Sequence, residues 1–262
     1  MTSTLAGFAA FAYVLCALLY WRRMAQGVAA SFAAVALFLH GGALFSATVH
    51  DGSLSLGVTE ALSVFAWQAA LLLWALSRVQ PVQMLGVAIY PVAAAAALTA
   101  ALWPTPVSAI PLSDWKIQLH VVLSLFSAGF LTLAATQAVT LAIQDRLLHD
   151  RAADSLVDVL PPLQTMEHLL FLMIGLGFFM LSLSLLSGLL FVDDLLAQHL
   201  AHKTVLSVAA WALFGVLLWG RWRRGWRGRT AIRWALSAYA LLIVAYFGSK
   251  VVLEQILSRH WS

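Results

Sequence analysis

Long runs of apolar residues, separated by short polar segments, dominate the chain from beginning to end. A helix needs about 20 predominantly apolar residues to cross the hydrocarbon core of a bilayer. The pattern predicts spans at residues 4–21, 27–48, 58–77, 83–103, 117–143, 168–192, 202–220 and 231–256. We therefore expect an all-α, polytopic membrane helical bundle of about eight transmembrane helices, formed as a single integral membrane domain over residues 1–262.

The composition supports this assignment. Hydrophobic residues make up 62% of the chain and charged residues 10%, against about 45–50% and 25% in soluble domains. A water-soluble fold would need more charge on its surface, whereas a lipid-facing surface needs none. The excess of basic over acidic residues does not indicate a nucleic-acid partner, because the basic residues cluster at the ends of apolar runs. The single cysteine, Cys16, excludes a disulfide within the chain and any CxxC redox motif.

Lysine and arginine residues in the short loops predict the orientation of the spans. They follow the first, third, fifth and seventh spans, as Arg22, Arg23, Arg78, Arg146, Arg151 and five arginines between positions 221 and 229. These loops all lie on one side of the membrane, which we expect to be cytoplasmic. Both termini are then periplasmic, residues 144–167 form the longest cytoplasmic loop, and the chain is a multi-pass protein of the bacterial inner membrane.

Histidines are the residues most able to carry chemistry. The sequence has no phosphate loop, no GxSxG and no HExxH, so it predicts no catalytic residue. It also lacks paired carboxylates within the spans, which argues against proton-coupled transport of the usual carboxylate kind. His40 lies about 12 Å below the outer end of the second span, His120 lies just inside the fifth, and His202 opens the seventh. Neutral imidazole is a common metal and haem ligand, although a histidine within a span often only bonds a neighbouring helix.

Two smaller patterns concern helix packing. Ser124 and Ser127 share a helix face with His120, so that face is polar and is expected to look inward. Glycines of the sixth span predict close helix contacts at Gly175, Gly177 and Gly188.

Several segments resemble a known family. WKIQLHVVLSLFSAGFLTLA, HKTVLSVAAWALFGVLLWGRWRRGWRGRTAIRW and AYFGSK resemble the cytochrome c assembly proteins of the CcsA/CcmC type, most closely the YpjD-like inner-membrane branch. TEALSVFAW resembles the opening of the family's third span, with Glu60 in the matching place. Carried over, His120 matches the family's first outward-facing haem-ligand histidine, and His40 matches its intramembrane histidine. The place of the family's tryptophan-rich segment reads VDDLLAQHLAHKT here, without tryptophan.

The resemblance implies a membrane haem-binding or haem-handling protein that assists cytochrome c assembly or haem delivery. We expect one haem, of b type, whose iron is bound by His40 and His120, with His202 as a further cofactor-binding candidate. The expected partners are haem, the lipid bilayer, and other membrane or cytochrome assembly proteins. Two alternatives stay open at this point: a HemX-like membrane regulator of tetrapyrrole synthesis, and a b-type cytochrome that carries electrons.

Overall fold

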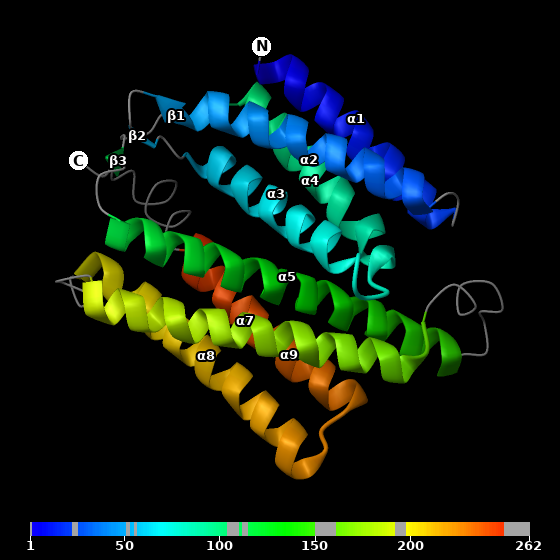
Figure 1. Ribbon diagram of the computed structural model, residues 1–262. Coiled ribbons are helices and arrows are strands. Elements are labelled where there is room, and N and C mark those ends of the chain that lie inside the picture. Colours follow the sequence, from blue (N-terminus) through cyan, green and yellow to red (C-terminus); the bar gives the residue numbers. More distant parts are fainter. Residues whose placement is uncertain are drawn as a thin grey trace. The chain divides into compact units, whose positions relative to one another are not determined.

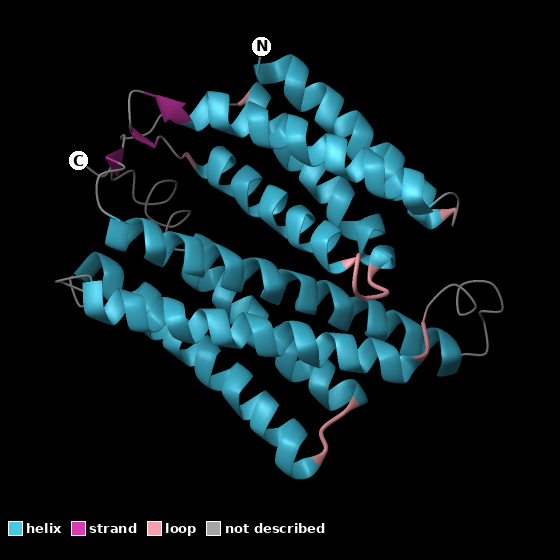
Figure 2. Ribbon diagram, viewed as in Figure 1, coloured by secondary structure: helices cyan, strands magenta, loops and turns pink. Residues whose placement is uncertain are grey.

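The chain is organised into two compact groups of helices. The computed structural model describes residues 2–22, 26–50, 53–54, 57–103, 110–111, 115–149, 161–191 and 198–248. Helices account for nearly all of this part of the chain, together with three strands of two residues each (Figures 1 and 2). The groups are Met1–Trp115, called unit 1, and Lys116–Ser262, called unit 2.

Unit 1 is a four-helix bundle. Its helices are α1 (Thr2–Trp21), α2 (Gln26–Thr48), α3 (Val58–Leu76) and α4 (Gly86–Leu102), with a 3₁₀ turn η1 (Gln83–Leu85) before α4. Helix α1 packs against α2 and α4, and α3 packs against the same two helices, so the four enclose a common core. Three strands form a small antiparallel sheet in the order β1 (Val49–His50), β2 (Ser53–Leu54) and β3 (Ile110–Pro111).

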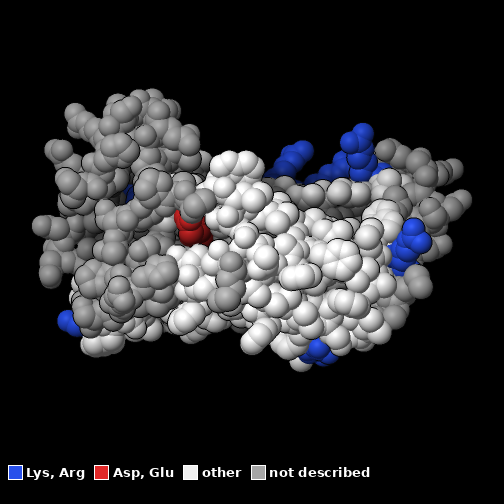
Figure 3. Space-filling model, turned by 90° about the horizontal axis from the view of Figure 1, so that it is seen from above, with Lys and Arg blue, Asp and Glu red and all other residues white. Residues whose placement is uncertain are grey.

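Small residues line the inside of unit 1 and large apolar residues cover its outside. Ala9, Ala33 and Ala93 are fully buried, whereas Phe38 is 82% exposed. This is the distribution expected in lipid, where small residues allow helix backbones to approach closely and apolar side chains face hydrocarbon chains. Figure 3 is consistent with a surface that faces lipid, because few of the described residues on the face that it shows are charged.

Unit 2 is held together by polar contacts between apolar helices. It contains α5 (Trp115–His149), α7 (Leu163–Phe191), α8 (Gln198–Arg224), α9 (Gly228–Ile243) and a π-helical turn η2 (Val244–Gly248). Ser127 Oγ donates to the Gly177 carbonyl oxygen at 3.2 Å, and this bond joins α5 to α7. The hydroxyls of Thr132 and Tyr239 lie 2.9 Å apart and join α5 to α9. Hydrogen bonds of this kind substitute for the hydrophobic driving force that lipid does not provide between helices.

A tight turn at the arginine-rich segment connects α8 to α9. Gly225 and Gly228 have φ angles of 65° and 51°, a region that favours glycine because it has no Cβ. The Gly228 N–H donates to Glu167 Oε1 at 2.7 Å, and Arg221 Nη1 lies 3.9 Å from the same carboxylate. The turn is therefore bound to the beginning of α7.

The structure confirms the predicted helical membrane bundle. Within the described residues, seven helices are long and apolar enough to cross a membrane. The expected eighth span, 231–256, corresponds to α9 and η2 as far as Gly248, and its remainder lies outside the described residues. Both edges of the expected 144–167 loop are helical, because α5 continues to His149 and α7 begins at Leu163. The short strands were not predicted, and the orientation of the termini and the single domain remain predictions.

Candidate functional site

The imidazole of His120 is held by serines of α7. Its Nδ1 lies 3.1 Å from the backbone carbonyl oxygen of Ser184 and 3.0 Å from Ser187 Oγ. The Ser187 hydroxyl itself donates to the Ser184 carbonyl at 2.8 Å. Ser124, one helical turn after His120, donates to the His120 carbonyl oxygen and lies 2.7 Å from Ser184 Oγ. The ring is thus positioned by α7, and Ser124 adds a second link between α5 and α7 beside it.

These contacts determine which ring nitrogen of His120 carries the proton. A carbonyl oxygen only accepts hydrogen bonds, so the bond to Ser184 requires the proton on Nδ1. Within the described part of the chain, no hydrogen-bond partner occurs for Nε2. His120 therefore has the arrangement typical of a metal-ligating histidine, in which one N–H is fixed by a backbone carbonyl and the other nitrogen keeps its lone pair.

His120 lines a large pocket in unit 2. The pocket has a volume of about 670 Å³ and is bordered by α5, α7, α8 and η2. Leucines of α7, together with Val208 and Trp211 of α8, form most of its wall. Lys203 and Tyr246 also line it, and Tyr246 belongs to the π-helical turn. Turns of this kind occur frequently at functional sites. The volume lies within the range of about 300–1,000 Å³ that is usual for pockets of small ligands and cofactors.

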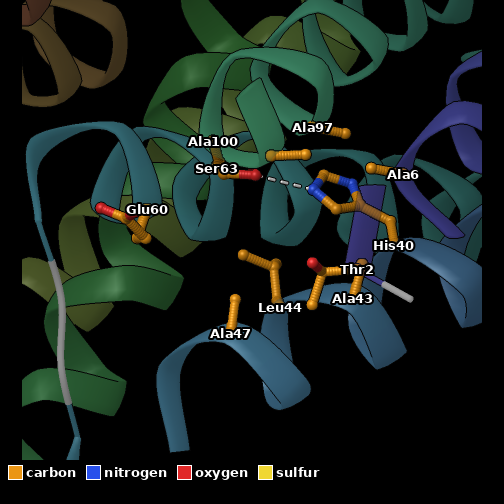
Figure 4. A pocket seen from close by; sticks show the side chains of 11 residues that line it. Thr2, Ala6, His40, Ala43, Leu44, Ala47, Glu60, Ser63, Ala97 and Ala100 are labelled. Atoms are coloured by element: carbon orange, nitrogen blue, oxygen red, sulfur yellow. Dashed lines mark hydrogen bonds between the residues drawn. The ribbon is translucent and has the colours of Figure 1, made fainter. Parts of the chain in front are cut away.

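His40 lies at a smaller pocket in unit 1 and both of its ring nitrogens have partners. Nε2 lies 2.8 Å from Ser63 Oγ, and Nδ1 lies 3.4 Å from the Tyr13 hydroxyl. The pocket has a volume of about 240 Å³, and its walls are mostly alanine side chains. Figure 4 shows Ser63 directed at the His40 ring, with Glu60 nearer the beginning of α3. Glu60 lies in the first turn of α3, as expected for a carboxylate that compensates the helix N-terminus, but it is also buried and lines the pocket.

The structure places the predicted residues in different surroundings. His40 belongs to unit 1 and His120 to unit 2, so their ligation of one iron stays a prediction. His202 lies near the beginning of α8, and its side chain is outside the described residues. Among the described residues, no group of three or more histidines, cysteines or carboxylates is placed to hold a metal ion.

The packing predictions near His120 are partly confirmed. Ser127 is fully buried and Ser124 contacts α7, so this face of α5 does look inward. Gly177 is in close contact with α5, whereas a β-carbon on Gly175 would meet nothing within 4 Å, so the prediction was wrong there.

The partners of both histidines were not predicted from the sequence. Ser184 and Ser187 lie at helical spacing in LSLSLLSGLL, and this polar face within an apolar run was the available signal. Tyr13 and Ser63 gave no comparable signal, because their proximity to His40 depends on the packing of three helices.

Comparison with known proteins agrees with these observations. The model of the family described as "Cytochrome C assembly protein" matches residues 32–257. The chain is 37% identical over 139 residues to the inner membrane protein YpjD of Escherichia coli K12, covering 53% of this chain and 52% of the relative. It is 28% identical over 148 residues to protein HemX of Brevibacillus brevis, covering 55% and 54% of the two chains. It is 25% identical over 100 residues to the cytochrome c biogenesis protein CcsA of Microcystis aeruginosa, covering 37% and 30%.

These matches have a limited extent. The chain spans about half the length of the curated relatives YpjD and HemX. No solved structure matches it. The family model, however, extends from α2 past η2 and includes every span from the third onward. The chain is a multi-pass membrane protein, and it belongs to the cytochrome c assembly protein family.

Proposed function

We propose that this protein of the bacterial inner membrane binds haem in the unit 2 pocket through His120 and assists the delivery of haem during cytochrome c assembly. The observation that carries the proposal is the hydrogen bonding of His120. These bonds fix the proton on Nδ1, and Nε2 has no hydrogen-bond partner among the described residues. A neutral imidazole in this state is a haem axial ligand. The relative YpjD is named an inner membrane protein, and this supports the proposed location in the inner membrane.

The residues around His120 fit such a cofactor. The apolar wall formed by Leu181, Val208 and Trp211 suits the faces of a macrocycle that is mostly hydrocarbon. Lys203 lines the same pocket and provides a cation for acidic side groups. When bound, haem supplies an iron whose redox chemistry the protein tunes through its ligand and surroundings.

The protein's own residues then have separate roles. Ser184 and Ser187 hold the His120 ring and its tautomer, and contacts of this kind raise the basicity of a ligating imidazole. The leucines of α7 present an apolar surface to the bound group. His202 directly precedes Lys203 in the chain, so it remains a candidate for a further ligand.

An absorbance spectrum of the purified protein tests the proposal. Protein produced with ample haem supply is expected to show a Soret band, which His120→Ala removes or shifts. His168→Ala is the matched control, because His168 is an exposed histidine of α7 and does not line the pocket. A wild-type protein without haem, or an unchanged spectrum for His120→Ala, would refute the proposal. Under the prediction that His40 shares the iron, His40→Ala also changes the spectrum.

The same material separates the two alternatives. The alternative of a HemX-like membrane regulator of tetrapyrrole synthesis has the weaker support, because the chain is 28% identical to protein HemX and 37% identical to YpjD; this function predicts a colourless protein. A b-type cytochrome that carries electrons would be coloured and would also be reduced rapidly by a quinol analogue.

A further inference from the structure

The arginines around the turn from α8 to α9 fall into two groups, and the first is paired with carboxylates of other helices (Figure 1). Arg221 Nη1 and Arg227 Nε lie 3.9 and 4.0 Å from Glu167 Oε2. Arg229 Nε lies 2.9 Å from Asp145 Oδ2. These pairs connect the turn to α7 and α5, so the positive charges of this group have a role within the fold.

The second group, Arg223 and Arg224, is exposed and lies on tryptophan rings. The Cζ atom of Arg223 is 4.9 Å from the centre of the Trp222 ring, and that of Arg224 is 5.3 Å from the centre of the Trp219 ring. Neither arginine side chain has a hydrogen bond or ion pair within the part of the chain that the structure describes. A guanidinium that stacks by its face keeps the N–H groups at its edge available to a further acceptor.

The two tryptophans under these arginines are exposed, unlike Trp74, which also carries an arginine. Arg78 lies over the Trp74 ring at 4.9 Å, but the Trp74 indole N–H donates to the Ala30 carbonyl oxygen at 3.0 Å, so this ring is part of the packing of unit 1. Trp219 and Trp222 are 50% and 76% exposed, and neither indole N–H has a partner among the described residues. An apolar ring with a free N–H is typical of tryptophan at a membrane–water interface.

An exposed apolar stripe of α8 leads to the same arginines. Ala212, Val216, Trp219 and Arg223 are separated by four, three and four residues, so they lie on one face of the helix. Ala212 is exposed and Val216 is 40% exposed, whereas Phe214, on another face of α8, is buried. Val216 and Arg223 are seven residues apart, which is about 10 Å along the helix axis. An apolar surface and a cationic end are therefore aligned on α8.

We propose that this surface of α8 binds an anionic phospholipid, with the headgroup phosphate at the edges of Arg223 and Arg224 and the acyl chains along the apolar stripe. A soluble anion would match the arginines alone, and a zwitterionic lipid has no net charge to compensate them. In the predicted orientation the site faces the cytoplasmic leaflet, where anionic lipids attract basic residues next to a span. The site lies outside the haem pocket, and lipid binding there does not depend on haem.

Native mass spectrometry of the full-length protein in detergent tests the proposal. Dioleoyl phosphatidylglycerol and dioleoyl phosphatidylcholine are titrated separately, and the affinity of the first bound lipid is compared. Each arginine next to an anionic headgroup should contribute about fivefold in affinity. The wild type should therefore bind phosphatidylglycerol about 25-fold more tightly than phosphatidylcholine, and Arg223→Gln/Arg224→Gln should lose most of this preference.

Two further double variants separate this surface from net charge. Arg22→Gln/Arg78→Gln is the matched control, because it removes the same amount of charge from unit 1, and Arg78 also lies over a tryptophan. It should keep the preference for phosphatidylglycerol. Trp219→Leu/Trp222→Leu retains both arginines but removes the rings that hold them, so it should weaken the binding of phosphatidylglycerol.

Three outcomes would overturn the proposal. The first is equal affinity of the wild type for the two lipids. The second is an equal loss of preference in the two arginine double variants, since the attraction would then depend on net charge alone. The third is displacement of the lipid by an equal concentration of glycerol 3-phosphate, which has a phosphate but no acyl chains. Haem content, measured on the same samples, is a separate readout and tests the unit 2 pocket alone.

Discussion

Replacement of Gly177 by alanine should destabilise unit 2 and loosen the histidine site. A β-carbon at position 177 would lie 2.6 Å from Leu131 Cγ and 3.3 Å from the Leu131 backbone nitrogen. Carbon atoms in good contact are about 3.5–4.0 Å apart, so α7 and α5 would have to separate by about 1 Å. Leu131 is fully buried and has little room to move. Overpacking of this kind costs about 1–3 kcal/mol.

The same displacement should reach His120. The Ser127 bond to the Gly177 carbonyl is already 3.2 Å long, and the bonds from His120 Nδ1 to α7 measure 3.0 and 3.1 Å. An added separation of about 1 Å would take them beyond the range of a hydrogen bond. We therefore expect Gly177→Ala to lower both the free energy of unfolding and the haem content.

Gly175→Ala is the control for this prediction. Gly175 lies on the same helix two residues earlier, and a β-carbon there would meet nothing within 4 Å. Since alanine favours helix over glycine by about 1 kcal/mol in a helix interior, this variant should be neutral or slightly more stable. Unfolding by SDS in mixed detergent micelles, followed by circular dichroism, compares the two variants. Equal stability of Gly177→Ala and Gly175→Ala would refute the packing argument.

Two further predictions concern the tautomer of His120 and the orientation of the chain. Ser187→Ala removes one acceptor of the His120 Nδ1–H but leaves the Ser184 carbonyl. Haem affinity in a titration should therefore fall by about tenfold, the smallest loss usual when a hydrogen-bond partner of a metal ligand is removed. Complete loss of binding would mean that Ser187 has another role. A reporter active only in the cytoplasm should be active when fused after Arg229 and silent when fused after Ser262, and activity at Ser262 would show that the number of spans is wrong.

The apolar runs were sufficient to predict the class of fold. Most backbone polar groups within a bilayer must be satisfied inside the segment itself, so a run of about 20 apolar residues has few options besides a helix. The positions of the helices follow for the same reason. The ends of the helices were harder to predict. Helix α5, for example, continues to His149 through polar residues, and their backbone forms the same helical hydrogen bonds as the apolar part of the helix.

The polar face of α5 could also be derived from the sequence. His120, Ser124 and Ser127 recur at helical spacing in an apolar run, and a polar stripe in lipid must look toward other helices. The prediction that His120 is a haem ligand came from the family resemblance. Neither the helical spacing nor the family resemblance identified Ser184 and Ser187 as partners of His120, because the register between α5 and α7 depends on the close contact at Gly177.

Only the tertiary structure decided what surrounds each histidine. His40 and His120 look alike in sequence, as single imidazoles in apolar spans, both predicted to lie toward the outer side. The packing of α1, α2 and α3 gives His40 a partner at each ring nitrogen, whereas among the described residues the contact between α5 and α7 gives His120 partners at Nδ1 alone. Hydrophobic periodicity specifies that a residue lies in a helix and on which face, but not which side chain of another helix lies at the same depth. That depends on interhelical distance and register, which small residues and specific hydrogen bonds determine in a membrane.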